Sequence, residues 1–382
     1  MSTVFRLTNG RGGPPPEFAG PPVARIFLVA SEVRDDSTGQ SILRLARELR
    51  RRGKEVDLAC GGGALVAEFE RLGIRPLVSR HLLAPGKPLL TPRALVSRVR
   101  EFNPDLLHFF GRPLAGWASR LSRITRRPYA LTVMTFASPS LRDEVRGDWR
   151  RGAVLAACQE LREELVNEDR VPKEAIAVIP IGVALEDYER YRDAGGPRTV
   201  PVVGTVGPLT PERGCEYFVR AAREILDRGC EAHFLIAGDG SEDLALRRLI
   251  RKLELDKQVT MAESFTDYRR MIAVLDVCVI PAIQEGLTLN VIEAMACRKP
   301  VVATGVGPVC SVISDGETGF LAPKKDPSAI ADKAIQLLSD RDLAQRIVER
   351  AYEMVRERFS MDLTVQNLLS FYSQCLARAK GA

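Results

Sequence analysis

Short apolar segments alternate with amphipathic helical segments along most of the chain, and this alternation limits the fold more than any other feature. Residues 24–31, ARIFLVAS, have the length and composition of a buried strand, and Ile42, Leu45 and Leu49 then recur at the spacing of one helix face. Residues 55–59 are typical of the next strand. Strands that alternate with helices predict parallel, doubly wound sheets of the α/β class.

The same alternation occurs in two halves of the chain. The strands expected in the first half are 24–31, 55–59, 106–110, 129–134, 154–157 and 177–179, and those in the second are 200–206, 232–237, 259–262, 274–280 and 301–304. Between the halves, residues 184–199 are highly charged, lack apolar periodicity and contain Gly-Gly-Pro, which is typical of a linker. Two Rossmann-like halves place a ligand in the cleft between them, at the carboxyl ends of the strands.

Composition excludes several other classes of protein. No segment approaches eighteen consecutive apolar residues, and residues 1–23 carry arginines and a Gly/Pro run instead of an apolar signal core. We therefore expect a disordered start and a cytoplasmic protein. The eight cysteines form no Cys-x-x-Cys pair and are interpreted as reduced core residues, so disulfides are not expected. The three histidines lie far apart in the sequence, so no metal site is expected either.

Positive charge is concentrated in the first half. Residues 1–190 contain 30 Lys/Arg against 23 Asp/Glu, a net charge of +7, whereas the remainder, with 25 against 26, has a net charge of −1. Much of the excess lies on one expected helix, at Arg44, Arg47, Arg50, Arg51, Arg52 and Lys54. We interpret this basic segment either as a solvated helix face or as a peripheral contact with an anionic membrane or acceptor. Nucleic acid is disfavoured as a partner, because aromatic residues are only 6% of the chain and are not interleaved with the arginines.

Residues 285–293, EGLTLNVIE, are the best indicator of function. They hold two carboxylates eight positions apart: Glu285 beside a glycine, and Glu293 inside a short apolar helix that Thr288 can cap. The N–H groups of a first helical turn attract phosphate, and a carboxylate can accept two hydrogen bonds from neighbouring sugar hydroxyls. We therefore predict a ligand that combines phosphate with sugar. The alternative is that Glu285 is a solvated loop residue and that Glu293 faces water.

This segment, with Pro300, a strand at 301–303 and two glycines after it, resembles the signature of the retaining glycosyltransferases of family 4. These enzymes have the GT-B fold, in which two Rossmann-like domains face a central cleft. The resemblance implies that Glu285 contacts the transferred sugar and that Glu293 holds the ribose of the nucleotide. The backbone amides that it implies for the diphosphate are those of Gly286, Leu287 and Thr288.

The resemblance covers the chain from Ala24 onward and gives each half a role. The predicted parts are a disordered segment 1–23, an N-terminal acceptor domain 24–190 that the C-terminal helix 363–382 joins, a linker 191–199 and a C-terminal donor domain 200–362.

The loop from Gly207 to Gly214 resembles the family segment that binds the donor diphosphate. In the family an arginine and a lysine normally occupy the positions of Pro208 and Arg213. We expect Gly207 to approach the diphosphate and Arg213 to bind it and to stabilise the leaving group. A guanidinium can hold two oxygens, whereas proline offers neither charge nor an N–H. The alternative is a proline-rich turn without a ligand.

Four further residues match family positions around the donor. Gly39 follows the first strand, where relatives face donor phosphate and acceptor, and Gly240 resembles the third glycine loop. Phe265 lies where relatives approach the nucleotide base, and Tyr268 lies there too. The alternative for each is an ordinary turn or packing residue.

Other positions depart from the family pattern. Met134 stands where many relatives present a histidine to the sugar, and Ile181 stands where the common motif has asparagine. His108 does match a histidine often found at the end of its strand, with a buried or capping histidine as the alternative.

The resemblance implies a retaining glycosyltransferase. It would take a sugar from a nucleoside diphosphate sugar, UDP- or GDP-linked, and place it on a hydroxyl of an envelope glycan, a lipid or a small molecule. No cofactor or metal is expected, since in this fold cationic side chains and helix-start amides neutralise the leaving diphosphate. The departures at Pro208, Met134 and Ile181 motivate an alternative, a GT-B scaffold without catalysis that serves as a binding or assembly subunit. Another GT-B enzyme, such as a sugar-nucleotide epimerase, is the third interpretation.

Overall fold

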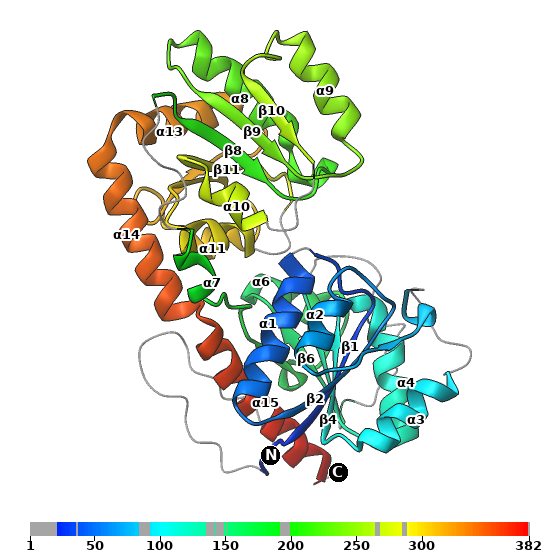
Figure 1. Cartoon of the computed structure of the whole chain (residues 1–382). Coiled ribbons are helices and arrows are strands. Elements are labelled where there is room, and N and C mark those ends of the chain that lie inside the picture. Colours follow the sequence, from blue (N-terminus) through cyan, green and yellow to red (C-terminus); the bar gives the residue numbers. More distant parts are fainter. Residues whose placement is uncertain are drawn as a thin grey trace. The chain divides into compact units, whose positions relative to one another are not determined.

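The computed structural model of the protein describes residues 21–35, 37–83, 92–134, 141, 149, 151–191, 199–263, 268–284 and 289–380. The chain forms two compact units. The first unit consists of Met1–Gly182 and Met361–Ala382, and the second unit consists of Val183–Ser360. In both units strands and helices alternate along the chain (Figure 1), as the sequence pattern predicts.

The described residues of the first unit form a parallel seven-stranded sheet with the order β3-β2-β1-β4-β5-β6-β7. Its strands are β1 (Arg25–Ala30), β2 (Glu55–Cys60), β3 (Leu77–Val78), β4 (Leu106–Phe110), β5 (Tyr129–Val133), β6 (Gly152–Ala156) and β7 (Ile176–Val178). Its helices are α1 (Ser37–Arg51), α2 (Val66–Arg71), α3 (Arg93–Phe102), α4 (Ala115–Thr125), α6 (Gln159–Asn167) and α15 (Met361–Lys380), with short 3₁₀ turns at Arg80–Leu83, Arg112–Leu114 and Lys173–Ala175. From β1 the chain adds β2 and β3 on one side of the sheet, and then returns to place β4 on the other side of β1. The strand order therefore reverses between β1 and β4.

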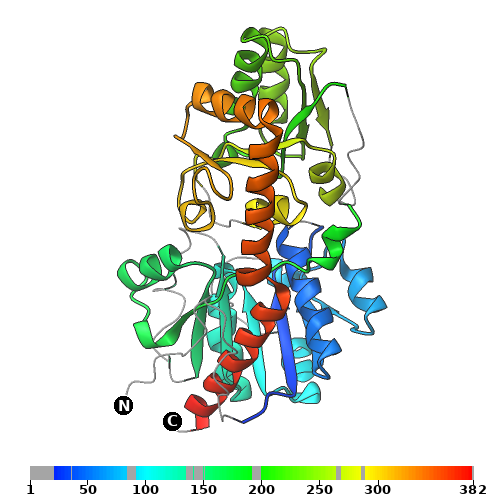
Figure 2. The same cartoon turned by 90° about the vertical axis from the view of Figure 1, so that its left-hand side faces the viewer.

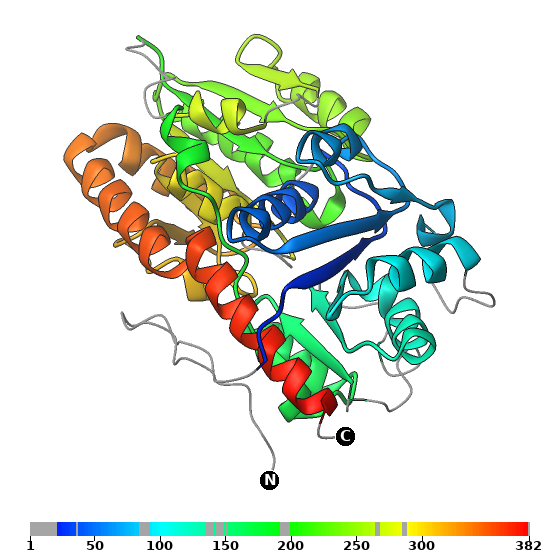
Figure 3. The same ribbon diagram turned by 60° about the horizontal axis from the view of Figure 1, so that its bottom comes forward.

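Helices cover both faces of this sheet. On one face, Phe27 and Phe109 belong to a core that also contains buried side chains of α3, α4 and α6. On the other face, α15 packs against α1 and β5, and Figure 3 shows α15 in red along this unit. Every residue of β4 and β5 is buried, which explains why these strands are continuously apolar instead of alternating.

The second unit repeats the architecture. Its described residues form a parallel six-stranded sheet with the order β10-β9-β8-β11-β12-β13. The strands are β8 (Val202–Val206), β9 (His233–Ala237), β10 (Val259–Ala262), β11 (Val277–Ile280), β12 (Val301–Thr304) and β13 (Phe320–Ala322). The helices are α7 (Glu186–Glu189), α8 (Cys215–Asp227), α9 (Asp243–Lys252), α10 (Tyr268–Ala273), α11 (Leu289–Ala296), α12 (Val309–Val312), α13 (Pro327–Ser339) and α14 (Arg341–Arg358), with a 3₁₀ turn, η4, at Pro211–Arg213. The strand order reverses between β8 and β11.

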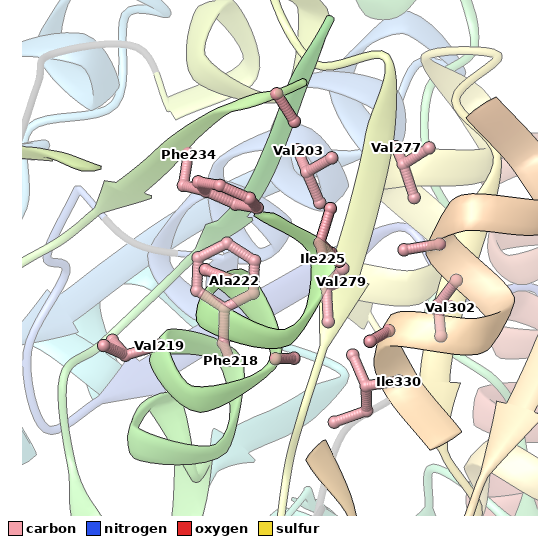
Figure 4. Packing of buried hydrophobic residues seen from close by; sticks show 14 of the residues in the cluster. Val203, Phe218, Val219, Ala222, Ile225, Phe234, Val277, Val279, Val302 and Ile330 are labelled. Atoms are coloured by element: carbon pink, nitrogen blue, oxygen red, sulfur yellow. The ribbon is translucent and has the colours of Figure 1, made fainter. Parts of the chain in front are cut away.

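The core of the second unit lies between α8 and the sheet (Figure 4). Phe218 and Ile225 on α8 lie among Val203, Phe234 and Val279 from three strands. The rings of Phe218 and Phe234 meet edge to face, with centroids 6.1 Å apart, an arrangement that aromatic pairs prefer. On another side of the unit, α14 packs against α11 (Figure 2), which fixes the helix that carries the signature segment.

The eleven predicted strands are all present, but the described residues form two further strands, β3 and β13, and some of the predicted strand limits differ. The sequence pattern does not predict β3 or β13, because two or three residues are too few to show a strand period. The segment predicted as a strand from 274 becomes a strand only at Val277. Val274 instead donates its N–H to the carbonyl of Arg270 at 3.2 Å, which continues the last turn of α10.

The boundary between the units also differs from the prediction. The second unit begins at Val183, whereas the sequence places residues up to 190 in the first domain. The physical reason is that Tyr188 and Tyr191 are buried, at 1% and 7% exposure, inside a stretch whose charge is typical of a linker. Within the predicted linker 191–199, residues 192–198 lie outside the described residues. The closing helix begins at Met361 and belongs to the first unit.

Two side-chain predictions are wrong. Arg44 is only 2% exposed and therefore does not belong to the solvated basic face of α1. Because α1 packs against α15, a wider stripe of the helix is buried than its apolar residues alone indicate. Cys310, predicted as a core residue, is exposed, whereas Cys60, Cys278 and Cys375 are buried as expected. Among the described helices, none has the length and apolar character needed to cross a bilayer.

Candidate functional site

The candidate site of the second unit lies where its strand order reverses. In open α/β sheets, ligands bind beyond the carboxyl ends of the strands at this switch point. Three segments of the described chain leave the sheet there: residues 207–214 after β8, residues 238–242 after β9, and residues 281–284 after β11. The sequence prediction of Gly207, Arg213 and Gly240 falls on these segments.

The first two segments stack on one another through their backbones. Gly207 donates its N–H to Ala237 at 2.9 Å, and Leu209 donates to Asp239 at 2.7 Å. A Cβ atom added at Gly238 would lie 1.9 Å from the carbonyl oxygen of Gly207, and one added at Gly240 would lie 2.2 Å from that of Leu209. Backbone packing therefore requires glycine at both positions. For Gly240 this packing role explains the glycine without a ligand.

Two side-chain nitrogens lie over Gly207. A Cβ atom added there would lie 2.9 Å from Nδ2 of Asn290 and 3.0 Å from Nη2 of Arg213. Asn290 is the second residue of α11 and donates a hydrogen bond from Nδ2 to the carbonyl of Val206 at 3.2 Å. Arg213 and Asn290 thus bring a cation and an amide donor to the end of β8, where Pro208 is exposed.

Asn290 is a candidate site residue that the sequence prediction missed. The available signal was weak: a single short polar side chain in the first turn of an otherwise apolar helix. Only its position beside Arg213 and Gly207 distinguishes it from an ordinary residue near a helix start.

The third segment is fastened to the turn that carries Arg213. Ile283 and Gln284 donate their N–H groups to the carbonyl of Glu212, at 2.8 and 3.2 Å. A Cβ atom added at Gly214 would lie 2.2 Å from the carbonyl oxygen of Pro281, and Gly214 adopts a φ of +61°, so this position also requires glycine. Gln284 directly precedes Glu285. The predicted site residues Glu285, Gly286, Leu287, Thr288 and Phe265 lie outside the described residues.

The charge of Arg213 acts on two neighbouring thiols. Burial raises the pKa of Cys215 to about 11 and that of Cys278 to about 12, while the guanidinium of Arg213 opposes both shifts by favouring the thiolate. Both cysteines are therefore neutral near pH 7, and neither competes with an anionic ligand for the positive charge of Arg213.

Glu293 is completely buried, at 0% exposure, in the middle of α11. Its Oε1 accepts a hydrogen bond from the hydroxyl of Tyr188 at 2.8 Å and another from the hydroxyl of Tyr268. The interpretation that Glu293 faces water is therefore wrong. A buried carboxyl group in an apolar helix is costly unless it is hydrogen-bonded, and the two phenols supply such bonds. Tyr188 was not among the predicted site residues, whereas Tyr268 was expected beside the nucleotide base and is found on Glu293 instead.

In the first unit, Gly39 has a local packing role. It lies in the first turn of α1 and is buried, and a Cβ atom added there would lie 1.9 Å from the carbonyl oxygen of Arg34. The side chains of Asp35 and Gln40 are joined by a 2.6 Å hydrogen bond around the same turn. Glycine at this position lets the loop after β1 approach the helix closely.

His108 is buried at 1% exposure, which agrees with its structural alternative. Its Nδ1 lies 2.5 Å from the hydroxyl of Tyr372 on α15, and its Nε2 lies 2.6 Å from the hydroxyl of Thr132 on β5. Burial lowers the pKa of His108 to about 3, so the imidazole is neutral at physiological pH.

Met134 and Ile181, two residues that depart from the family pattern, lie close together. Both line a cavity of about 50 Å³ in the first unit, together with Phe110, His108 and Leu368. The cavity lies between the sheet, α1 and α15, toward the carboxyl ends of β4 to β7. Its lining is almost wholly apolar. Within the described part of the chain, no group of three or more His, Cys, Asp or Glu side chains is arranged to hold a metal ion.

Comparisons with known proteins agree with this arrangement. The family model for glycosyl transferases group 1 matches residues 187–354, and the model for glycosyltransferase family 4 matches residues 38–187. The chain is 30% identical to the alpha-D-kanosaminyltransferase of Streptomyces kanamyceticus over 338 residues, which cover 87% of this chain and 81% of the relative. It is 29% identical to the D-inositol 3-phosphate glycosyltransferase of Corynebacterium efficiens over 405 residues, covering 92% and 95% of the two chains.

Solved structures show the same fold. Anabaena Alr3699/HepE in complex with UDP and glucose superposes with a TM-score of 0.77 at 21% identity, over 92% of this chain and all of that chain. A glycosyltransferase from Rickettsia africae superposes with a TM-score of 0.76 at 18% identity, over 92% and 99% of the two chains. At these identities the likeness establishes the GT-B fold of two Rossmann-like units, as predicted.

Proposed function

Because the chain belongs to the group 1 and family 4 glycosyltransferases, we propose that it takes a sugar from a nucleoside diphosphate sugar. The chain is a glycosyltransferase with the GT-B fold. A UDP- or GDP-linked donor is the proposal that its second unit supports best, and the acceptor is a hydroxyl of a glycan, a lipid or a small molecule. The relative of Streptomyces kanamyceticus is named an alpha-D-kanosaminyltransferase, and the Anabaena protein was solved in complex with UDP and glucose.

The observation that carries the proposal is the pair of donors over Gly207. A diphosphate placed at the end of β8 meets the guanidinium of Arg213 and the amide of Asn290, and the glycine lets both nitrogens lie close to the backbone there. A fixed cation beside the leaving group stabilises the charge that develops as the bond to the sugar breaks. With these donors the reaction needs no bound metal ion, and we include metal independence in the proposal.

The two glutamates of the signature segment complete the donor site. We assign the ribose to Glu293, whose buried carboxylate is held on α11, and the transferred sugar to Glu285. The amides of Gly286, Leu287 and Thr288 contribute to diphosphate binding, and Phe265 approaches the base. Transfer proceeds with retention of configuration, with a donor phosphate oxygen helping to deprotonate the acceptor. This assignment rests on the family resemblance, and the burial of Glu293 and the position of Arg213 beside Gly207 support it.

Calorimetric titration with UDP, GDP and ADP tests the diphosphate site. We expect Arg213→Ala to weaken binding of the preferred diphosphate by about ten- to a hundredfold, because one charge-assisted hydrogen bond is worth about 1.5–3 kcal/mol. Binding of the corresponding nucleoside, which lacks the phosphates, should change little. Arg220→Ala is the matched control, because Arg220 is a half-exposed arginine on α8 that pairs with Glu216.

Unchanged diphosphate affinity in Arg213→Ala would remove the diphosphate from this loop. If the wild-type protein binds none of the three nucleotides and hydrolyses none of a panel of UDP- and GDP-sugars, the proposed donor class is wrong.

We also propose that the basic segment of α1 and the residues after it contacts anionic membrane surfaces. Arg47, Arg50 and Arg51 are exposed there, although Glu48 lies 3.4 Å from Arg51 and 3.2 Å from Arg52 and offsets part of the charge. Flotation with neutral and anionic vesicles at two salt concentrations tests this contact. Equal flotation with both, or none with either, would leave these arginines as a solvated face.

A further inference from the structure

Two phenol hydroxyls share one oxygen of Glu293. Tyr188 donates to Oε1 at 2.8 Å, and Tyr268 donates to the same oxygen. A carboxylate oxygen has two lone-pair positions, so the acceptor capacity of Oε1 is taken by these two hydroxyls. A ribose hydroxyl that is to bind this oxygen must replace one of them.

The two tyrosines differ in their exposure. Tyr188, on α7, is 1% exposed, and Glu293 itself is 0% exposed. Tyr268, the first residue of α10, is only half-buried. Of these three residues, Tyr268 is therefore the one that reaches solvent, and it can leave Glu293 without moving through the core.

An ion pair beside the tyrosines holds their two helices together. Asp187 precedes Tyr188 and Arg269 follows Tyr268, and the guanidinium of Arg269 lies 3.2 Å from the carboxylate of Asp187. The side chains of the pair are 12% and 24% exposed, so this bridge is sheltered from solvent. It links α7 to α10 beside Glu293, so an exchange there can proceed by rotation of a tyrosine side chain while the helices stay joined.

We propose that Tyr268 occupies the position of a ribose hydroxyl on Glu293 and is exchanged for that hydroxyl when a nucleotide binds. Tyr188 stays in place as a positioning residue that holds the carboxylate. The exchange keeps the number of hydrogen bonds to Oε1 at two, because one hydroxyl donor replaces another. The site then selects nucleoside diphosphates that carry the contacting ribose hydroxyl over their deoxy analogues. This inference rests on the proposed role of Glu293.

The two tyrosines should respond to the same substitution with opposite signs. In Tyr268→Phe the ribose hydroxyl no longer has to displace a phenol hydroxyl from Oε1, so the affinity for UDP or GDP should rise by about three- to thirtyfold. In Tyr188→Phe the lost donor lies on the buried side, so the carboxylate is no longer held and the affinity should fall by about tenfold. Tyr217→Phe, which removes the hydroxyl of a half-buried tyrosine on α8, is the control and should leave the affinity for both nucleotides unchanged.

Calorimetric titration of these variants with ribo-, 2′-deoxy- and 3′-deoxynucleoside diphosphates makes the test specific. The gain in Tyr268→Phe should appear with the ribonucleotide and vanish with whichever deoxy analogue lacks the contacting hydroxyl. Equal or weaker ribonucleotide binding in Tyr268→Phe overturns the exchange. If Tyr188→Phe proves too unstable to titrate, Tyr268→Phe alone decides, because the expected sign of its effect is opposite to that of a structural loss.

Glu293→Gln separates this inference from the function on which it rests. If Glu293→Gln abolishes the preference for ribose over deoxyribose but Tyr268→Phe shows no gain, the exchange is wrong and the ribose assignment stands. If the preference survives in Glu293→Gln, the ribose does not lie on this residue and both fall.

Discussion

The two units share one sheet topology, but the side chains at their strand-order reversals are charged and polar in the second unit and mostly apolar in the first. In the second unit, the reversal between β8 and β11 collects Arg213, Asn290 and the buried carboxylate of Glu293. In the first unit, the helix after β1 and the ends of the strands beyond β4 line an apolar cavity, and the one histidine there is neutral. A switch point therefore provides a crevice, and its side chains decide what the crevice can bind.

The contrast also extends to how each region is held. The loops of the second unit are joined by backbone contacts at Gly214, Gly238 and Gly240. The corresponding region of the first unit also has a close backbone contact at Gly39, but it is joined in addition by side-chain hydrogen bonds between His108 and both Thr132 and Tyr372. Backbone contacts are sensitive to any added atom, whereas a side-chain network is sensitive to protonation.

The largest effect should come from adding one methyl group to the stacked loops. Gly238→Ala places a Cβ atom 1.9 Å from a backbone carbonyl oxygen, so we expect a loss of about 2–4 kcal/mol in the free energy of unfolding, with weaker nucleotide binding. Gly229→Ala is the control. It also has a positive φ, but it has nothing within 4 Å, and should cost only about 1 kcal/mol. Urea denaturation measures both, and equal losses would show that the loops yield without strain.

The second largest effect should be a loss of folding stability in acid, caused by the buried histidine of the first unit. Unfolded histidine binds a proton below about pH 6.5, but His108 in the fold does so only near pH 3. Between these values the unfolded state binds more protons, so the stability conferred by neutral His108 is lost as the pH falls from 6.5. The expected loss is about 1.4 kcal/mol per pH unit in this window.

His108→Gln keeps a donor and an acceptor but cannot titrate, so it isolates this contribution. The stability difference between the wild type and His108→Gln, measured by urea denaturation at pH 7 and at pH 5, should shift against the wild type. His233→Gln, which removes a partly exposed histidine of the second unit, should track the wild type. A pH-independent difference for His108→Gln would mean that the imidazole accepts its proton without loss of the fold.

The smallest effect should come from restoring a missing cation. Pro208 is exposed beside Arg213, at the position where the family normally has arginine. Pro208→Arg should tighten diphosphate binding by about three- to tenfold, since an added exposed charge contributes less than a sheltered one. Titration at low and high salt measures it. Pro208→Gln, which restores the N–H without the charge, is the control, and an equal gain in this variant would assign the effect to the backbone.

The fold could be predicted because its signal is repeated. Each long strand is a continuous apolar segment, and each large helix repeats its apolar residues over several turns, so a single exception does not hide the pattern. The stretch around Tyr188 shows the limit. Four charged residues surround this tyrosine between 186 and 190, and their number indicates a linker, although the tyrosine itself is buried against Glu293.

The site could be predicted only where it is continuous in sequence. Glu293 and Arg213 lie in recognisable segments, but Tyr188 and Tyr268 reach Glu293 from two other helices, and Asn290, in the same segment and helix as Glu293, lies over Gly207. Their positions depend on how those helices pack, and a sequence pattern does not contain that information. Arg44 shows the same limit in reverse, since its burial follows from the packing of α1 against α15.

The place of α15 in the chain has a consequence for biosynthesis. The second unit, Val183–Ser360, is one continuous stretch, whereas the first unit needs α15, which is translated after it. At 5–20 residues per second the ribosome needs about 9–36 s to pass that stretch, during which the first sheet is complete but its partner helix does not yet exist. Tyr372 and Phe371 are then absent from a face that they later cover. Nascent chains arrested before Met361 should therefore recruit chaperones through the first unit, although it is synthesised first.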